Sequence, residues 1–234
     1  MSPSTKSSSR RLPPRASRSH RIARRYVAGL GVAAAAAVAV AVALALAAAA
    51  PSAADTSAKT RVTVIGDSIT ASFDYVPAAR RYLGRGLDLR SDAVVCRRLV
   101  STSCAFRGAT PASALQMIGA QRRALGPVVV INVGYNDWTA VYDVDRVMRA
   151  LKAAGVKTAI WVTLRETTSN YAQVNARIRN AARRWRKSLV IADWNAYSHG
   201  MPWFRGDGLH LTVSGAMGLA RLLRPLVVTA SAVS

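Results

Sequence analysis

The sequence predicts an α/β fold with three layers, α/β/α, built around a five-stranded parallel sheet. Short apolar runs alternate along the chain with longer segments of helical periodicity, and strands separated by helices form parallel sheets that helices cover on both faces. The run from Val128 to Val133 is apolar except at Asn132, as expected of a strand buried on both sides. With 234 residues, 51% of them hydrophobic, the chain is long enough for one full-sized domain.

The elements are expected in regular alternation from residue 61 onwards. Pro77 interrupts the first helical segment, Pro111 suits the first turn of the second, and Gly155 is expected to end the third. Strands are expected at residues 62–65, 87–95, 128–133, 158–162 and 189–192. Helices are expected at residues 69–83, 111–125, 144–154, 171–185 and 212–223.

The N-terminal residues predict export. Residues 1–25 are basic and rich in Ser and Pro, residues 26–50 are uninterruptedly small or apolar, and residues 51–60 form a small-residue linker suited to signal cleavage. The run at 26–50 is also long enough to span a bilayer, so a cleaved signal peptide and a single membrane anchor both remain open. Arg24-Arg25 leaves the twin-arginine export route open beside the general one. Residues 61–229 are expected as one extracytoplasmic domain.

The chain is strongly basic, with a formal net charge of +22. From residue 55 onwards, 25 Lys and Arg residues face 11 acids, which still leaves +14. This excess favours an anionic partner, either a polymer of the cell envelope or a membrane surface, and a merely solvated basic surface is the alternative. Nucleic acid is not expected, because the sequence contains no zinc-finger or aromatic RNA-binding pattern. Composition does not determine the oligomeric state.

Two cysteines occur, Cys96 and Cys104. They are too few for a structural zinc site and do not form a CxxC redox motif. In an exported protein they are expected to form a short local disulfide, with two unpaired thiols as the alternative. The sequence implies no metal and no organic cofactor.

Polar residues follow three of the predicted strands. Ser68 comes directly after the first strand, Asn136 follows the third, and the loop after the fifth strand contains Asp207 and His210. Ligands of a parallel sheet bind outside the carboxyl ends of its strands. These side chains are therefore expected to converge at one edge of the sheet.

The same residues are those that acyl transfer needs. Ser68 is the candidate nucleophile, His210 the base, and Asp207 the group that orients the histidine ring. The side-chain amide of Asn136 and the backbone N–H groups of Ser68 and Gly108 are candidate donors to the oxyanion. Each motif alone also fits a helix cap, a turn or a surface histidine. Their order and their common position at strand ends favour the catalytic interpretation.

Three motifs resemble blocks of the SGNH or GDSL hydrolases, over residues 61–223. They are Gly66-Asp67-Ser68-Ile69, Gly134-Tyr135-Asn136-Asp137 and Asp207-Gly208-Leu209-His210. The resemblance implies a flavodoxin-like fold and a serine esterase. In this family the matching serine, histidine and aspartate form the catalytic triad, and the serine N–H, a glycine N–H and the asparagine amide form the oxyanion hole. Gly108 is assigned to that glycine by its position alone.

Residues 193–212 are also similar to the extracellular SGNH domains of membrane acyltransferases that O-acetylate cell-wall glycans. The expected function is therefore hydrolysis or transfer of small O-acyl groups, above all O-acetyl on envelope carbohydrate. A lipase or thioesterase acting on lipid acyl chains is one alternative, and a non-catalytic module that binds an envelope polymer is another. Trp138, Trp194 and Trp203 lie in or beside the same loops, where they are expected either to line the substrate site or to pack in the core.

Overall fold

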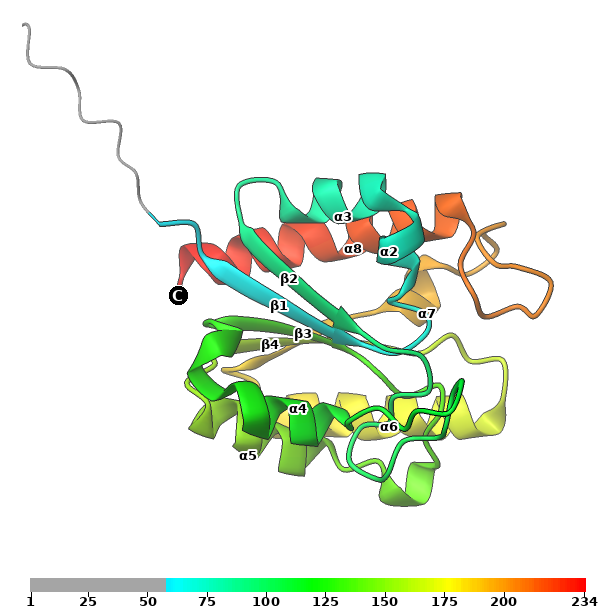
Figure 1. Cartoon of the computed structure of the whole chain (residues 1–234), viewed down its shortest axis with the longest axis horizontal. Helices are drawn as coiled ribbons and strands as arrows, with labels where there is room; N and C mark the ends of the chain where they lie inside the picture. Colours follow the sequence, from blue (N-terminus) through cyan, green and yellow to red (C-terminus); the bar gives the residue numbers. More distant parts are fainter. Residues whose placement is uncertain (1–57) are drawn as a thin grey trace, which may run out of the picture. The chain divides into compact units, whose positions relative to one another are not determined.

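Five parallel strands form one sheet in the order β2-β1-β3-β4-β5 (Figure 1). This order is that of flavodoxin-like folds and confirms the predicted fold class. The strands are β1 (Arg61–Gly66), β2 (Asp88–Ala93), β3 (Val128–Asn132), β4 (Thr158–Val162) and β5 (Leu189–Ala192). The computed structural model describes residues 58–234, so the expectations for residues 1–25 and 26–50 and most of the linker lie outside the described residues.

Helices cover both faces of the sheet and complete the three layers (Figure 1). One face carries α2 (Ser72–Tyr75), α3 (Pro77–Gly84) and α8 (Val213–Ala232). The other face carries α4 (Ala114–Gln121), α5 (Val144–Ala153) and α6 (Ser169–Arg184). The short helices η1 (Arg122–Leu125), η2 (Thr139–Val141) and α7 (Trp194–Tyr197) lie in the connections.

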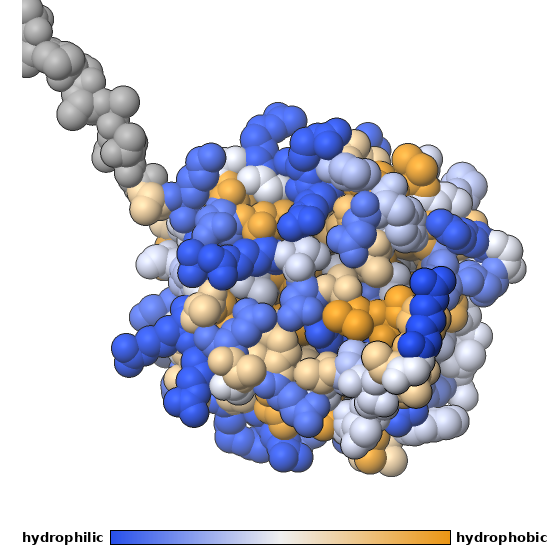
Figure 2. All heavy atoms as spheres, viewed as in Figure 1, coloured by the Kyte–Doolittle hydropathy of each residue, from blue (hydrophilic) through white to orange (hydrophobic). Residues whose placement is uncertain are grey.

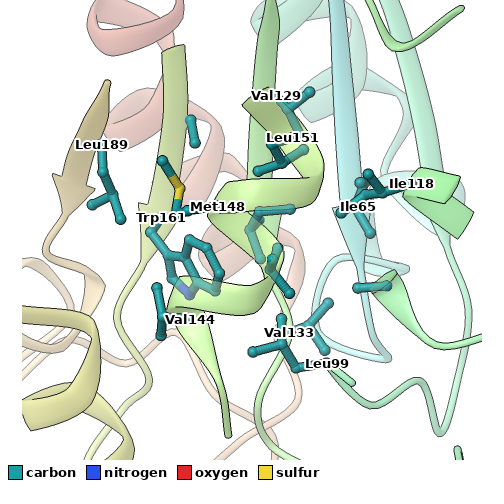
Figure 3. Packing of buried hydrophobic residues seen from close by; sticks show 14 of the residues in the cluster. Ile65, Leu99, Ile118, Val129, Val133, Val144, Met148, Leu151, Trp161 and Leu189 are labelled. Carbon is teal, nitrogen blue, oxygen red and sulfur yellow. The ribbon is translucent and has the colours of Figure 1, made fainter. Parts of the chain in front are cut away.

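Each face of the sheet has its own hydrophobic core. Met148 of α5 packs beside Trp161 of β4 in the core between the sheet and α4, α5 and α6 (Figure 3). Phe73 of α2 and Leu219 of α8 belong to the core on the opposite face. Both cores and the whole sheet lie within residues 58–234, which form one compact unit together with residue 57. This part of the chain therefore contains everything that the fold requires.

The helical segment expected at 111–125 begins and divides differently from the sequence expectation. The segment expected at 111–125 is α4 followed by η1, and Pro111 lies before the helix rather than in its first turn. Ser113 caps α4, because its hydroxyl accepts the Gln116 N–H at 3.3 Å and the Gln116 side chain accepts the Ser113 N–H at 2.9 Å. This reciprocal capping box starts the helix at Ala114.

The last helix is longer than expected, because α8 continues through Pro225 to Ala232 instead of ending at Leu223. Proline costs one helical hydrogen bond, but Val227 and Ala230 beyond it are buried in the core and hold the helix in place. Within the described part of the chain, α8 is the one helix long and apolar enough to cross a membrane. Its buried side packs against α3 and the sheet, as a core helix does.

The parallel strands give the sheet two distinct edges. We call the loops that lead into the strands the amino edge and the loops that follow the strands the carboxyl edge, which lies on the right in Figure 1. The amino edge consists of residues 58–60, 85–87, 122–127, 154–157 and 185–188. The carboxyl edge consists of residues 67–71, 94–113, 133–143, 163–168 and 193–212. All four side chains of the candidate site lie on the carboxyl edge.

Candidate active site

The loop after β1 is fixed by a buried carboxylate next to the candidate nucleophile. The Asp67 carboxylate accepts the N–H of Ile69 at 3.0 Å and the N–H groups of Gly134 and Tyr135 at 3.3 Å each. Burial raises the pKa of Asp67 to about 6, although these hydrogen bonds favour the ionised form. Asp67 thus holds the Ser68 turn against the loop that follows β3, a role that sequence reasoning did not assign to it.

Ser68, His210 and Asp207 form a hydrogen-bonded relay. The Nε2 atom of His210 lies 3.0 Å from Ser68 Oγ, and its Nδ1 atom lies 2.6 Å from Asp207 Oδ2. Asp207 Oδ1 also accepts the backbone N–H groups of Leu209 and His210 at 2.9 Å each. The Leu209 bond, followed by the bond to the His210 ring, lowers the pKa of Asp207 to about 2. The carboxylate is therefore ionised at neutral pH and can hold the histidine in the tautomer that accepts the serine proton.

The loop that carries His210, residues 204–211, is held by contacts at both its base and its tip. An isolated bridge joins Phe204 to Leu211, and the Arg205 N–H donates to the His210 carbonyl at 2.7 Å. At the tip, the guanidinium of Arg165 donates to the carbonyl of Gly208 and lies 3.9 Å from the centre of the Phe204 ring. Arg165 was missed by the sequence analysis, although its position directly after β4 places it on the same edge.

Asn136 is positioned by the loop that follows β2. Its Nδ2 atom donates to the backbone carbonyl of Arg97 at 3.3 Å. The backbone carbonyl of Asn136 accepts a hydrogen bond from Arg98 Nε at 2.8 Å. In addition, the Leu99 N–H donates to the carboxylate of Asp137 at 3.0 Å. A side-chain amide has two N–H groups, so the bond to Arg97 leaves one donor for an oxyanion. Sequence reasoning missed the 97–99 segment, because its contacts depend on how two distant loops pack.

Gly108 lies further along the same loop, in an exposed turn closed by hydrogen bonds between Phe106 and Ala109. Its φ angle of +79° suits glycine and strains other residues. Within residues 58–234, no hydrogen bond joins Gly108 to Ser68 or Asn136. Its place in the oxyanion hole stays a prediction.

The predicted disulfide between Cys96 and Cys104 is present. The Cys104 N–H also donates to the Cys96 carbonyl at 3.3 Å. Closing so short a loop contributes only ~2.5 kcal/mol in the chain-entropy model. Because the bridge begins one residue before Arg97, its main effect is to hold the segment that supports Asn136.

The three tryptophans differ in exposure. Trp194 is 1% exposed and stacks on Trp203 with 5.7 Å between the ring centroids, so of its two expected roles the structure shows core packing. Trp203 is half-buried and packs over Gly215 and Gly218 of α8. Trp138 is 68% exposed, beside Asp137. It is the candidate that remains free to contact a substrate.

Replacing Asn136 with Ala is expected to lower kcat about 10²- to 10³-fold, because one oxyanion donor is lost. KM should change much less, since this donor acts chiefly in the transition state. Steady-state kinetics on a soluble ester measures both effects. Asn170→Ala is the matched control, because the Asn170 amide supports the same loop through the Asp137 carbonyl at 2.9 Å. Equal losses in the two variants would assign Asn136 a structural role only.

The Asp137→Asn variant is expected to change how stability depends on pH. Burial raises the pKa of Asp137 from 3.8 to about 7, so folding favours the protonated carboxyl. The contribution of Asp137 to the free energy of unfolding is complete at acid pH and is lost as the pH rises from about 4 to about 7. Asparagine can still accept the Leu99 N–H but does not titrate. Urea titrations across this pH range should therefore show a flatter profile for Asp137→Asn than for the wild type, whereas the exposed control Asp74→Asn should follow the wild type.

Within residues 58–234, no group of three His, Cys, Asp or Glu side chains is placed to hold a metal ion. The relay from Asp207 through His210 to Ser68 is an arrangement that acyl transfer uses, and the amide of Asn136 is a candidate donor to the oxyanion.

Comparisons with solved structures agree with the fold. The structure is similar to the crystal structure of TesA, with a TM-score of 0.52 and 18% identity over 73% of this chain and 99% of the other. For a putative arylesterase from Agrobacterium tumefaciens str. C58 the TM-score is 0.54 and the sequence identity 16%, over 73% of this chain and 99% of the other. For a carbohydrate acetylesterase family member from Sinorhizobium meliloti the TM-score is 0.55 and the sequence identity 16%, over 74% of this chain and 99% of the other. No curated protein matches the chain.

The sequence also matches a family model over more than half of the chain. The profile of the GDSL-like lipase/acylhydrolase family covers residues 64–217, which include Ser68, Asn136, Asp207 and His210. The three-layer fold, the all-parallel sheet and the similar esterase structures agree with that match. The chain therefore belongs to the GDSL-like lipase/acylhydrolase family and is a serine ester hydrolase of the SGNH type.

Proposed function

We propose that this enzyme acts outside the cytoplasm and removes or transfers short acyl groups, above all O-acetyl, on carbohydrate of the cell envelope. The observation that carries the proposal is the relay from Asp207 through His210 to Ser68, with contacts of 2.6 and 3.0 Å. The N-terminal sequence supports export, and so does the Cys96–Cys104 disulfide, since disulfides persist in oxidising compartments.

In the proposed mechanism, Ser68 Oγ attacks the ester carbonyl while His210 Nε2 takes its proton. Asn136 and the backbone N–H of Ser68 stabilise the oxyanion, with Gly108 as the third predicted donor. The imidazolium then gives its proton to the departing alcohol, which leaves an acyl group on Ser68. Water, or an acceptor hydroxyl, then attacks the acyl group and loses its proton to His210. His210 passes this proton to Ser68 Oγ as the bond between Oγ and the acyl group breaks. Asp207 stabilises the charged ring in both steps and stays ionised throughout.

The exposure of the site favours a small acyl group on a large substrate. The side chains of His210 and Asp207 are 41% and 47% exposed, so the relay lies at the surface of the domain. A bulky carbohydrate can approach such a site, whereas a long acyl chain needs an apolar channel to cover it. Trp138, exposed beside the oxyanion loop, offers a flat face on which a sugar ring can stack.

Esters of graded chain length test the proposal. Residues 58–234 should hydrolyse p-nitrophenyl acetate faster than the butyrate, octanoate and palmitate, and should release acetate from an acetylated polysaccharide. A preference for palmitate would favour the lipase alternative. Binding of the polysaccharide without turnover of any ester would favour the non-catalytic module.

Trp138→Ala separates carbohydrate contact from catalysis. We expect it to raise KM for the acetylated polysaccharide several-fold, because a stacked aromatic contact contributes about 1 kcal/mol. Its kinetics on p-nitrophenyl acetate should stay unchanged, since Trp138 lies outside the relay. The matched control is Tyr197→Ala, which removes an exposed aromatic ring next to the Trp203 stack. If Trp138→Ala left both substrates unaffected, Trp138 would have no role in substrate binding.

A further inference from the structure

The amino edge of the sheet is uniformly basic. Its five loops contain seven Lys and Arg residues and no Asp or Glu, and all seven are exposed. They are Lys59, Arg85, Arg122, Arg123, Lys157, Arg186 and Lys187. None of the seven forms a salt bridge with a residue of the described chain. In Figure 2, hydrophilic side chains project on the side where β1 begins.

The carboxyl edge has a different charge balance. Its loops contain five arginines and six acids, so the candidate active site lies in nearly neutral surroundings. Of the two edges, the one opposite to the relay is therefore the basic one, and the rest of the excess positive charge lies on the helices and strands. A role in attracting substrate to Ser68 does not explain such a distribution.

A hollow of about 620 Å³ opens into this edge, between the ends of α5 and α6. Met148, Leu151, Val156 and Trp185 form apolar parts of its wall. Its lining also includes five basic residues, Lys152, Lys157, Arg184, Arg186 and Lys187, of which Arg184 forms a salt bridge with Asp145. The volume is within the range of ordinary ligand sites. An apolar wall with basic residues in its lining suits a molecule that has an anionic head and an apolar part.

The chain enters the domain at the same edge. Residues 58–60 lead into β1, which lies two strands from β4 and hence roughly 10 Å from the strand below the hollow. The ten residues 51–60 can span at most ~35 Å beyond the apolar run at 26–50. If that run is retained in a bilayer, the linker connects the bilayer to the domain at its amino edge.

We infer that the amino edge docks on an anionic phospholipid surface, with lipid headgroups at the rim of the hollow. In this orientation the carboxyl edge, with Ser68, faces away from the bilayer and into the envelope. The arrangement gives the enzyme access to envelope polymers and keeps its active site away from the ester bonds of the membrane's own lipids. The inference does not depend on the proposed substrate.

Vesicle sedimentation tests the inference, with residues 58–234 as the protein. We expect binding to vesicles of equal parts phosphatidylglycerol and phosphatidylcholine, no binding to pure phosphatidylcholine, and release as salt screens the charges. The triple reversal Lys157→Glu, Arg186→Glu and Lys187→Glu should lower the partition coefficient at least ~100-fold, because each basic residue near an anionic surface contributes roughly a fivefold factor.

A matched control changes the net charge by the same amount elsewhere. Arg80→Glu, Arg81→Glu and Arg221→Glu reverse three exposed charges on α3 and α8 that form no salt bridge in the described chain. This variant should keep most of the binding. Both triple variants should keep their activity on p-nitrophenyl acetate. Basic residues near helix C-termini also stabilise helices, so thermal unfolding should be measured beside binding to separate the two effects.

Three results would overturn the inference. One is an equal loss of vesicle binding in both triple variants, which would show an effect of net charge alone. Another is no binding of the wild type to phosphatidylglycerol vesicles. A third is binding of soluble polyphosphate without vesicle binding, which would make the edge a polymer site. Because Ser68→Ala should bind vesicles like the wild type, this test is independent of whether the esterase proposal succeeds.

Discussion

Replacing Ser68 with Ala is expected to reduce ester hydrolysis to background. The hydroxyl that lies 3.0 Å from His210 Nε2 is then absent, and no covalent acyl-enzyme can form. In serine hydrolases such a loss reaches about 10⁶-fold in kcat. Ester turnover by the purified variant, with circular dichroism to confirm folding, gives the measurement. Wild-type activity in a well-folded Ser68→Ala variant would disprove the nucleophile assignment.

His210→Ala is expected to cost nearly as much, and the double variant little more than either single one. Nucleophile and base act as one unit, so their losses do not add. His199→Ala is the control, because His199 is an exposed histidine outside the relay. Additive losses in the double variant would mean that Ser68 and His210 act separately, and the relay would then not be the catalytic unit.

Replacing Asp207 with Asn is expected to lower kcat about 10³- to 10⁴-fold, with little change in KM. The low pKa of Asp207, about 2, keeps a negative charge against His210 Nδ1 at working pH, and asparagine removes that charge. Without it the histidine tautomer is poorly fixed and the imidazolium is less stable. The loop itself should persist, since the asparagine oxygen can still accept the Leu209 and His210 N–H groups.

Asp143→Asn is the matched control for this variant. Asp143 lies in another loop of the carboxyl edge, where its carboxylate caps α5 by accepting the Arg146 N–H at 2.9 Å. Asparagine caps helices equally well, so kcat should not change. Steady-state kinetics of both variants on p-nitrophenyl acetate measures the two values of kcat. An active Asp207→Asn enzyme would show that His210 is oriented by other contacts.

The sequence predicted the sheet well, because burial on both faces leaves a strong signal. The runs at β4 and β5 have the predicted bounds, and Ser68 after β1 meets His210 and Asp207 after β5 as expected. This convergence follows from topology, since parallel strands all end at one edge. Family membership added the roles of these residues.

Other features depend on tertiary contacts that no local pattern encodes. Arg165 contacts Gly208 across two loops, and Arg97 supports Asn136 from a loop whose course its own sequence does not predict. The burial of Trp194 depends on stacking with Trp203. Proline favours a helix end near Pro225, but the packing of Val227 and Ala230 in the core outweighs the hydrogen bond that proline costs α8.

The half-exposed side chains of His210 and Asp207 also bear on the fate of the acylated enzyme. Bulk water reaches the serine ester as soon as the alcohol departs, and it competes with every other acceptor. The acyl-enzyme then partitions between water and a sugar hydroxyl. The sugar receives the acyl group only if it is bound at the site before water hydrolyses the serine ester. With no acceptor held in place, hydrolysis is the default outcome. Whether the enzyme works as a transferase therefore depends on how tightly the second sugar is retained, rather than on a change in the triad.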